Sequence, residues 1–209
     1  MALNRDRPVP RSELVDAVWS AARPRDPAEA LAALLSKVRA AIGGDYIAGR
    51  SEVAIRLPAD AVVDVERAFK AVHEAESACV RADWPRAWSA ALESLFVARR
   101  RLLQEFEAGW IDEWRRSLAD VRLRGLECYG TACLGTGGAE LPAAERAARE
   151  LVQLAPLRES GYGLLMEALG AQGNVAEALV VYETLRQHLR DTLGMSPAEP
   201  VQAVYLRLL

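Results

Sequence analysis

The sequence lacks the features of secreted and membrane proteins. It has only three cysteines in 209 residues, so a set of paired disulfides cannot be formed without one left over. No apolar run near the start precedes a small-residue cleavage site, and no stretch approaches the roughly 18 apolar residues that a membrane helix needs. The sequence therefore predicts a cytoplasmic protein without disulfides, signal peptide or membrane span.

Catalytic and metal-binding constellations are equally scarce. The two histidines, His73 and His188, have no nucleophile and carboxylate in a recognisable arrangement. Cys128 and Cys133 have C-x4-C spacing but no nearby partner ligands, so we interpret them as small buried residues. The glycine-rich run at 135–138 lacks the Lys-Ser/Thr that follows in a phosphate loop. We therefore expect no enzymatic activity, no cofactor and no metal.

Strand-forming residues are also few. Isoleucine occurs four times, whereas alanine and leucine together provide 66 residues, which favours helix over strand. The formal net charge is −3, but residues 1–57 carry nine Lys and Arg against seven Asp and Glu. The composition thus predicts a mainly α-helical protein with a slight basic excess at its start.

Two helices are predicted in the first third of the chain. Ser12 is the expected N-cap of the first helix, and Asp26 is the expected N-cap of the second, with Pro27 at its first position. The second helix has an apolar stripe with a period of 3.6 residues. This stripe is formed by Leu31, Leu34, Leu35, Val38 and Ile42.

The following segment predicts a β-hairpin. Within residues 46–57, Val53, Ile55 and Leu57 alternate with other residues after a Gly-containing turn, and residues 7–9 favour a short edge strand. Strand, helix, turn, helix and hairpin are the order of the latter part of a winged helix-turn-helix. Because a complete winged helix needs another helix before this point, we expect residues 1–57 to form an N-terminally incomplete domain with a partial core.

Residues 58–209 predict helices throughout and contain an internal repeat. Ala144 and Ala178 are 34 residues apart, as are Leu151 and Leu185, and small residues occupy the expected helix contacts. This period is typical of tetratricopeptide repeats, which stack into a right-handed solenoid with a concave face. Ala87, Ala90 and Ala91 indicate an earlier, more degenerate unit. The expected helices are 62–80, 84–104, 108–134, 142–154, 159–172, 175–192 and 198–209.

Four parts of the sequence resemble a known family. "RPVPRSELVDAVW" (7–19) is similar to the entry of OmpR-type DNA-binding domains, and "SKVRAAIG" (36–43) to the end of their recognition helix. "EFEAGWIDEWRRSL" (105–118) and residues 154–209 resemble the bacterial transcriptional activator domain. This layout is that of the Streptomyces antibiotic regulatory protein (SARP) family. The resemblance implies a transcriptional activator whose winged helix binds DNA, and whose helical repeats form a homodimer and contact RNA polymerase or sigma factor.

The candidate DNA contacts lie in the partial winged helix. Ala32 and Ala33 occupy positions where the family usually carries polar side chains, and alanine cannot form a hydrogen bond with a base edge. We therefore expect mainly phosphate contacts and a modest, salt-dependent affinity. The candidate residues are Arg23, Arg25, Ser36, Lys37, Arg39, Arg50 and Ser51.

The sequence predicts two domains, a partial winged helix-turn-helix over 1–57 and a bacterial transcriptional activator domain with helical repeats over 58–209. Two alternatives to a DNA-binding activator stay open. The chain could be a protein-interaction scaffold with a vestigial winged helix that does not bind DNA. It could also be a segment of a larger multidomain regulator.

Overall fold

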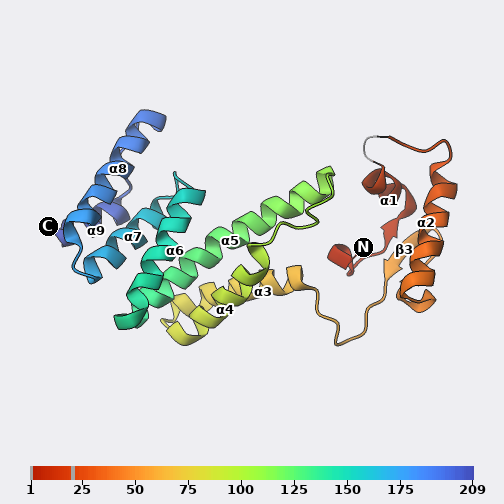
Figure 1. Ribbon diagram of the computed structural model, residues 1–209, viewed down its shortest axis with the longest axis horizontal. Coiled ribbons are helices and arrows are strands. Elements are labelled where there is room, and N and C mark those ends of the chain that lie inside the picture. Colours follow the sequence, from red (N-terminus) through yellow and green to blue (C-terminus); the bar gives the residue numbers. More distant parts are fainter. Residues whose placement is uncertain (1, 20–21) are drawn as a thin grey trace. The chain divides into compact units, whose positions relative to one another are not determined.

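The computed structural model describes residues 2–19 and 22–209, and most of them are helical (Figure 1). These residues form two compact units. The first, here called the head unit, contains the chain up to Arg67 together with Arg101–Ser117. The second, here called the repeat unit, contains Ala68–Arg100 and Leu118–Leu209.

The head unit has the predicted order of a short strand, two helices and a hairpin. Its three strands form an antiparallel sheet in the order β1-β3-β2, with Val9 opposite Val53 and Ile47 opposite Ile55. The expected edge strand and hairpin are therefore confirmed. The elements are a 3-10 turn at Ala2–Asn4, β1 (Val9–Pro10), α1 (Arg11–Val18), α2 (Pro27–Ile42), a 3-10 turn at Gly44–Tyr46, β2 (Ile47–Ala48) and β3 (Glu52–Ile55).

The two helix starts differ in how well the sequence predicted them. The Asp26 carboxylate accepts a hydrogen bond from the Glu29 N–H at 2.9 Å, which confirms the predicted cap of α2. The predicted Ser12 cap is wrong, because α1 begins at Arg11 after an extended Pro10. The Arg11 N–H instead donates to the Ser51 carbonyl at 3.3 Å, so pairing with the hairpin sets where α1 starts.

The core of the head unit is small. Leu31 and Leu35 of α2 are buried against Ile47 and Val53 of the hairpin, with Leu14, Val15 and Trp19 packed beside them. The rest of the predicted stripe stays accessible: Leu34 and Val38 are each 38% exposed, and Ile42 is 46% exposed. Among the described residues, α1 and the hairpin thus bury only part of the apolar face of α2.

The segment 101–117 belongs to the head unit and corrects one predicted helix. The helix expected over 84–104 ends at Ala98. Beyond it, the Arg115 guanidinium donates to the carbonyls of Leu102 at 3.1 Å, Leu103 at 3.0 Å and Phe106 at 2.7 Å. These carbonyls bond with a side chain instead of continuing a helix, and Leu103 adopts a positive φ of 46°.

The helices of the repeat unit confirm the predicted helical repeats. They agree with the expected ranges to within a few residues, apart from the end of the helix expected over 84–104. In the part of the chain that the structure describes, none is long and apolar enough to cross a membrane. The helices are α3 (Asp64–Val80), α4 (Trp84–Ala98), α5 (Gly109–Thr136), α6 (Leu141–Leu154), α7 (Glu159–Ala171), α8 (Val175–Leu193) and α9 (Glu199–Leu208), with a 3-10 turn at Gly138–Glu140. The starts of two of them, residues 64–67 of α3 and 109–117 of α5, belong to the head unit.

Small residues let the helices of the repeat unit approach closely. The helix α7 contacts α6, α8 and α9, and Figure 1 shows these four helices side by side at the C-terminal end. The alanines that were predicted at helix contacts are buried, in accord with a role in packing. They are Ala87, Ala90 and Ala91 in α4, Ala144 in α6 and Ala178 in α8. Three further alanines of α6, Ala143, Ala147 and Ala148, are buried as well.

Candidate nucleic-acid interface

One face of α2 points away from the core of the head unit. Leu31 and Leu35 define the buried side of this helix. At 3.6 residues per turn, the opposite side is formed by Glu29, Ala33, Ser36, Lys37 and Ala40. All five are exposed. The side of α2 opposite its core contacts therefore carries one carboxylate, one ammonium group, one hydroxyl and two methyl groups.

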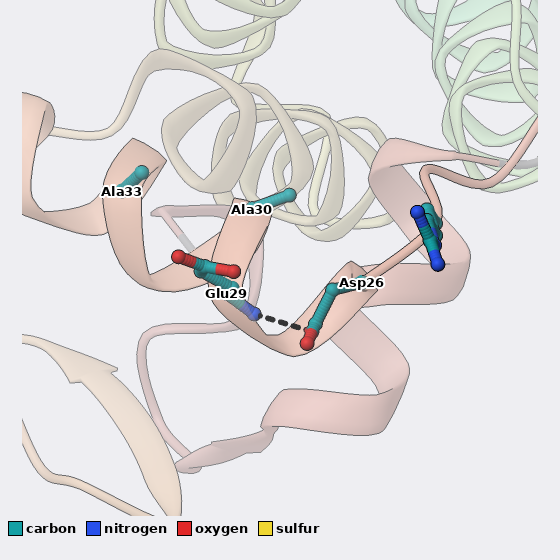
Figure 2. Close-up of a pocket in the computed structure, with 5 residues that line it drawn as sticks. Asp26, Glu29, Ala30 and Ala33 are labelled. Atoms are coloured by element: carbon teal, nitrogen blue, oxygen red, sulfur yellow. Dashed lines mark hydrogen bonds between the residues drawn. The ribbon is translucent and has the colours of Figure 1, made fainter.

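A hollow of about 600 Å³ lies at the start of this face (Figure 2). It is lined by Arg25, Asp26, Glu29, Ala30 and Ala33. The Asp26 carboxylate is already used, because it accepts the Glu29 N–H, and the dashed line in Figure 2 marks this bond. The Glu29 carboxylate has no ion-pair partner among the described residues, so both of its oxygens can accept hydrogen bonds from a ligand, whereas one oxygen of Asp26 is occupied.

Two of the candidate cations already have partners within the head unit. Arg23 forms an ion pair with Asp16, and both side chains are largely exposed. Arg39 is half-buried, and its guanidinium donates to the carbonyls of Ile47 at 3.3 Å and Gly49 at 3.4 Å. Arg39 thus links α2 to the start of the hairpin.

The other candidate residues are exposed. Arg25 lies in the hollow, Lys37 on α2, and Arg50 in the hairpin turn. Within the described residues, none of these three cations has a carboxylate partner. Ser36 and Ser51 are also exposed, on α2 and in the hairpin turn. Among the candidate residues, the structure therefore leaves three cations and two hydroxyls accessible on α2, just before it and in the hairpin turn.

Arg11 is a residue of this region that the sequence did not reveal. Its guanidinium donates to the Arg50 carbonyl at 2.9 Å, in addition to its N–H bond with the Ser51 carbonyl. Arg11 therefore fixes the hairpin turn to the start of α1. Only the register of the sheet brings residues 11 and 50 together, so no local pattern could have indicated this contact.

The arginines between the repeats are also engaged. Arg124 of α5 forms a two-bond ion pair with Glu76 of α3, at 2.6 and 2.7 Å, and this pairing lowers the pKa of the Glu76 carboxyl. Arg158, before α7, pairs with Glu127 of α5 at 2.6 Å. Because both guanidinium groups are neutralised, these contacts join successive repeats rather than presenting unpaired positive charge.

Comparison with known proteins identifies the class. Residues 63–209, most of the chain, match the bacterial transcriptional activator domain. The chain therefore belongs to this family, which is one of transcriptional regulators and not of enzymes.

The chain is also similar over its whole length to two Streptomyces regulators. It is 29% identical to the regulatory protein AfsR of Streptomyces coelicolor, and 29% identical to AfsR of Streptomyces griseus. The predicted SARP-type resemblance is thereby confirmed. The chain spans 21% of the length of each of these relatives.

Two solved structures have related folds. The chain of Mycobacterium tuberculosis EmbR in complex with a low affinity phosphopeptide superposes with a TM-score of 0.83 at 20% identity, over 98% of this chain and 55% of that one. The second is the TPR2B domain of yeast Sti1 from its complex with pHsp70. It superposes with a TM-score of 0.50 at 19% identity, over 68% of this chain and 96% of that one. These matches confirm the mainly helical fold with tetratricopeptide-like repeats.

Proposed function

We propose that this protein is a cytoplasmic activator of transcription that binds DNA through α2 and the hairpin of the head unit. In this proposal residues 1–57 act as the DNA-binding part. Residues 58–209 form a homodimer and contact RNA polymerase or sigma factor. The family match supports the regulatory role. The observation that carries the DNA-binding part is the group of exposed candidate cations that have no carboxylate partner within residues 2–19 and 22–209, namely Arg25, Lys37 and Arg50.

The number of accessible cations sets the expected salt dependence. Each cation that neutralises a phosphate of duplex DNA contributes about −0.9 to the slope of log affinity against log salt. Three such contacts give a slope of about −2.7, which is roughly a 40-fold loss of affinity between 50 and 200 mM salt. Arg23 and Arg39 add less, because Asp16 and the hairpin carbonyls hold their guanidinium groups.

A salt series of binding curves tests this proposal. Fluorescence anisotropy with labelled promoter duplexes from the neighbourhood of the encoding gene measures the slope for the wild type and for Lys37→Ala and Arg50→Ala. Each substitution should make the slope shallower by about 0.9. Lys70→Ala is the matched control, because Lys70 is an exposed lysine of α3 in the repeat unit. Its slope should equal that of the wild type.

Two results would refute the DNA-binding part. One is the absence of binding at 50 mM salt, and the other is an unchanged slope in both head-unit variants. Sedimentation of the protein tests the homodimer separately, since a monomer at micromolar concentration contradicts it. Retention of purified RNA polymerase holoenzyme on the immobilised protein tests the remaining contact.

The interaction scaffold is the second candidate function. Ala33 and Ala40 favour it, because two methyl groups on the outer face of α2 provide no hydrogen bonds to a base. A protein that binds no duplex at low salt, yet retains the polymerase, would support the scaffold over the DNA-binding activator.

A further inference from the structure

We infer that α2 reads a cytosine with a neighbouring thymine, through the Glu29 carboxylate and the Ala33 methyl group. This inference rests on the proposed DNA binding and concerns the base preference of the same surface. It starts from the hollow of Figure 2, where both residues lie on the outward side of the helix.

The chemistry of Glu29 selects a base that donates a hydrogen bond. An ionised carboxylate can only accept. In the major groove, cytosine offers its N4 amine as a donor, and adenine offers its N6 amine beside the acceptor N7, whereas guanine offers the acceptors N7 and O6, and thymine offers the acceptor O4. Glu29 therefore favours cytosine over adenine, because N7 repels the carboxylate, and it opposes guanine and thymine. Asp26 is less suited to this contact, because its Oδ1 atom already accepts the Glu29 N–H and holds the carboxylate at the start of α2.

The chemistry of Ala33 suits the C5 methyl group of thymine. A short apolar side chain contacts this methyl group well, and it gains nothing from the polar edges of the other bases. Glu29 and Ala33 are four residues apart, so they lie one above the other on the same side of α2. Side chains three to four positions apart on a recognition helix contact successive bases, which places the thymine beside the cytosine.

The charges around the hollow make this arrangement specific. The Glu29 carboxylate repels phosphates, so it weakens binding to any DNA that offers it no amine. Arg25 in the same hollow and Lys37, one turn beyond Ala33, supply the attraction that holds the duplex. Removing the carboxylate should therefore strengthen binding to unrelated DNA and weaken the discrimination between bases.

Selection of bound duplexes from a randomised pool at 100 mM salt tests the inference. The wild type should enrich a cytosine with an adjacent thymine, and replacing this cytosine should cost about tenfold in affinity. In Glu29→Gln the preference at that position should change to adenine, because glutamine bonds both N6 and N7 of adenine. Replacing the thymine by uracil should cost about fourfold, the value of one buried methyl group.

Glu199→Gln is the matched control, since Glu199 is an exposed glutamate in the first turn of α9 in the repeat unit, as Glu29 is in α2, and the charge change is the same. Its selected sequences should equal those of the wild type. Circular dichroism checks that each variant folds, and the Glu29 side chain is exposed, so its substitution leaves the core intact.

The outcomes separate this inference from the proposed function. If the wild type binds no duplex even at 50 mM salt, the proposed function fails and the inference fails with it. If the wild type binds with the expected salt slope but selects no cytosine, only the inference is overturned. The same holds if Glu29→Gln selects the same sequences as the wild type.

Discussion

Gly125 of α5 lies where this helix approaches α4 closely, and Gly125→Ala measures how tight that approach is. A Cβ atom at this position would lie 2.7 Å from the Ser94 hydroxyl oxygen and 3.2 Å from the Leu95 Cγ and Cδ2 atoms. Ser94 is 0% exposed and Leu95 is 1% exposed. The Ser94 hydroxyl also donates to the Ala91 carbonyl at 2.8 Å, so neither neighbour can move into solvent.

The expected magnitude is the difference between two opposing effects. Inserting a methyl group into a well-packed core costs about 1–3 kcal/mol, and a contact below 3.0 Å with buried neighbours places Gly125→Ala near the upper value. Alanine gains about 1 kcal/mol over glycine inside a helix. The free energy of unfolding should therefore fall by about 2 kcal/mol, which lowers the melting temperature by about 4–8 °C in a chain of this length.

Thermal unfolding followed by circular dichroism measures this loss. Gly109→Ala is the control, because Gly109 begins the same helix and an added Cβ there meets nothing within 4 Å. The double variant Gly125→Ala with Ser94→Ala removes the closest clashing atom, so it should lose less stability than the two single changes added together. A Gly125→Ala protein as stable as the wild type, or strictly additive losses, would refute the close approach.

Three further predictions follow from contacts of single side chains. Arg39→Ala should weaken DNA binding but leave the salt slope of the binding unchanged, because Arg39 bonds the hairpin carbonyls rather than a phosphate. A slope that is shallower by about 0.9 would instead show that Arg39 contacts a phosphate. Since Arg124 lowers the pKa of Glu76 below 4.5, their pairing stabilises the fold above that pH and is lost as the pH falls. Urea unfolding should therefore find Glu76→Gln about 0.5–1 kcal/mol less stable than the wild type at pH 7, with the gap closing below about pH 4; a constant gap contradicts this. A thiol-reactive dye should label Cys79 before the other cysteines. The neighbouring Cys128 thiol lowers the pKa of Cys79, whereas the Cys79 thiol and burial raise the pKa of Cys128. Fast labelling that persists in Cys79→Ser would contradict this order.

Local patterns predicted much of the head unit. Asp26 followed by Pro27 indicated the start of α2, because capping and a preset φ act within one turn of helix. The alternation around Val53 indicated the hairpin for a similar reason, since neighbouring side chains of a strand point to opposite faces. The start of α1 was predicted wrongly, because a hydrogen bond across the sheet to Ser51 decides it.

The candidate site was less predictable than the fold. Residue type alone placed Arg23, Arg39 and Lys37 in one class of phosphate contacts. The structure separates them, because Arg23 faces Asp16, Arg39 bonds hairpin carbonyls, and Lys37 stays exposed. Glu29 was not among the predicted contacts. Its outward position and the hollow around it are the signals that bring it into the site.

The amino-acid sequence by itself determined the helical class, the 34-residue repeat and the order of strand, helices and hairpin, because these depend on spacing between residues near one another in the chain. It also determined the family, through the similarity of residues 63–209 to the bacterial transcriptional activator domain. Only the tertiary structure decided which charges stay accessible and where α4 ends. Beyond the end of α4, Arg115 holds the segment in a non-helical course by binding the carbonyls of Leu102, Leu103 and Phe106, and a guanidinium finds such partners only after the chain has folded.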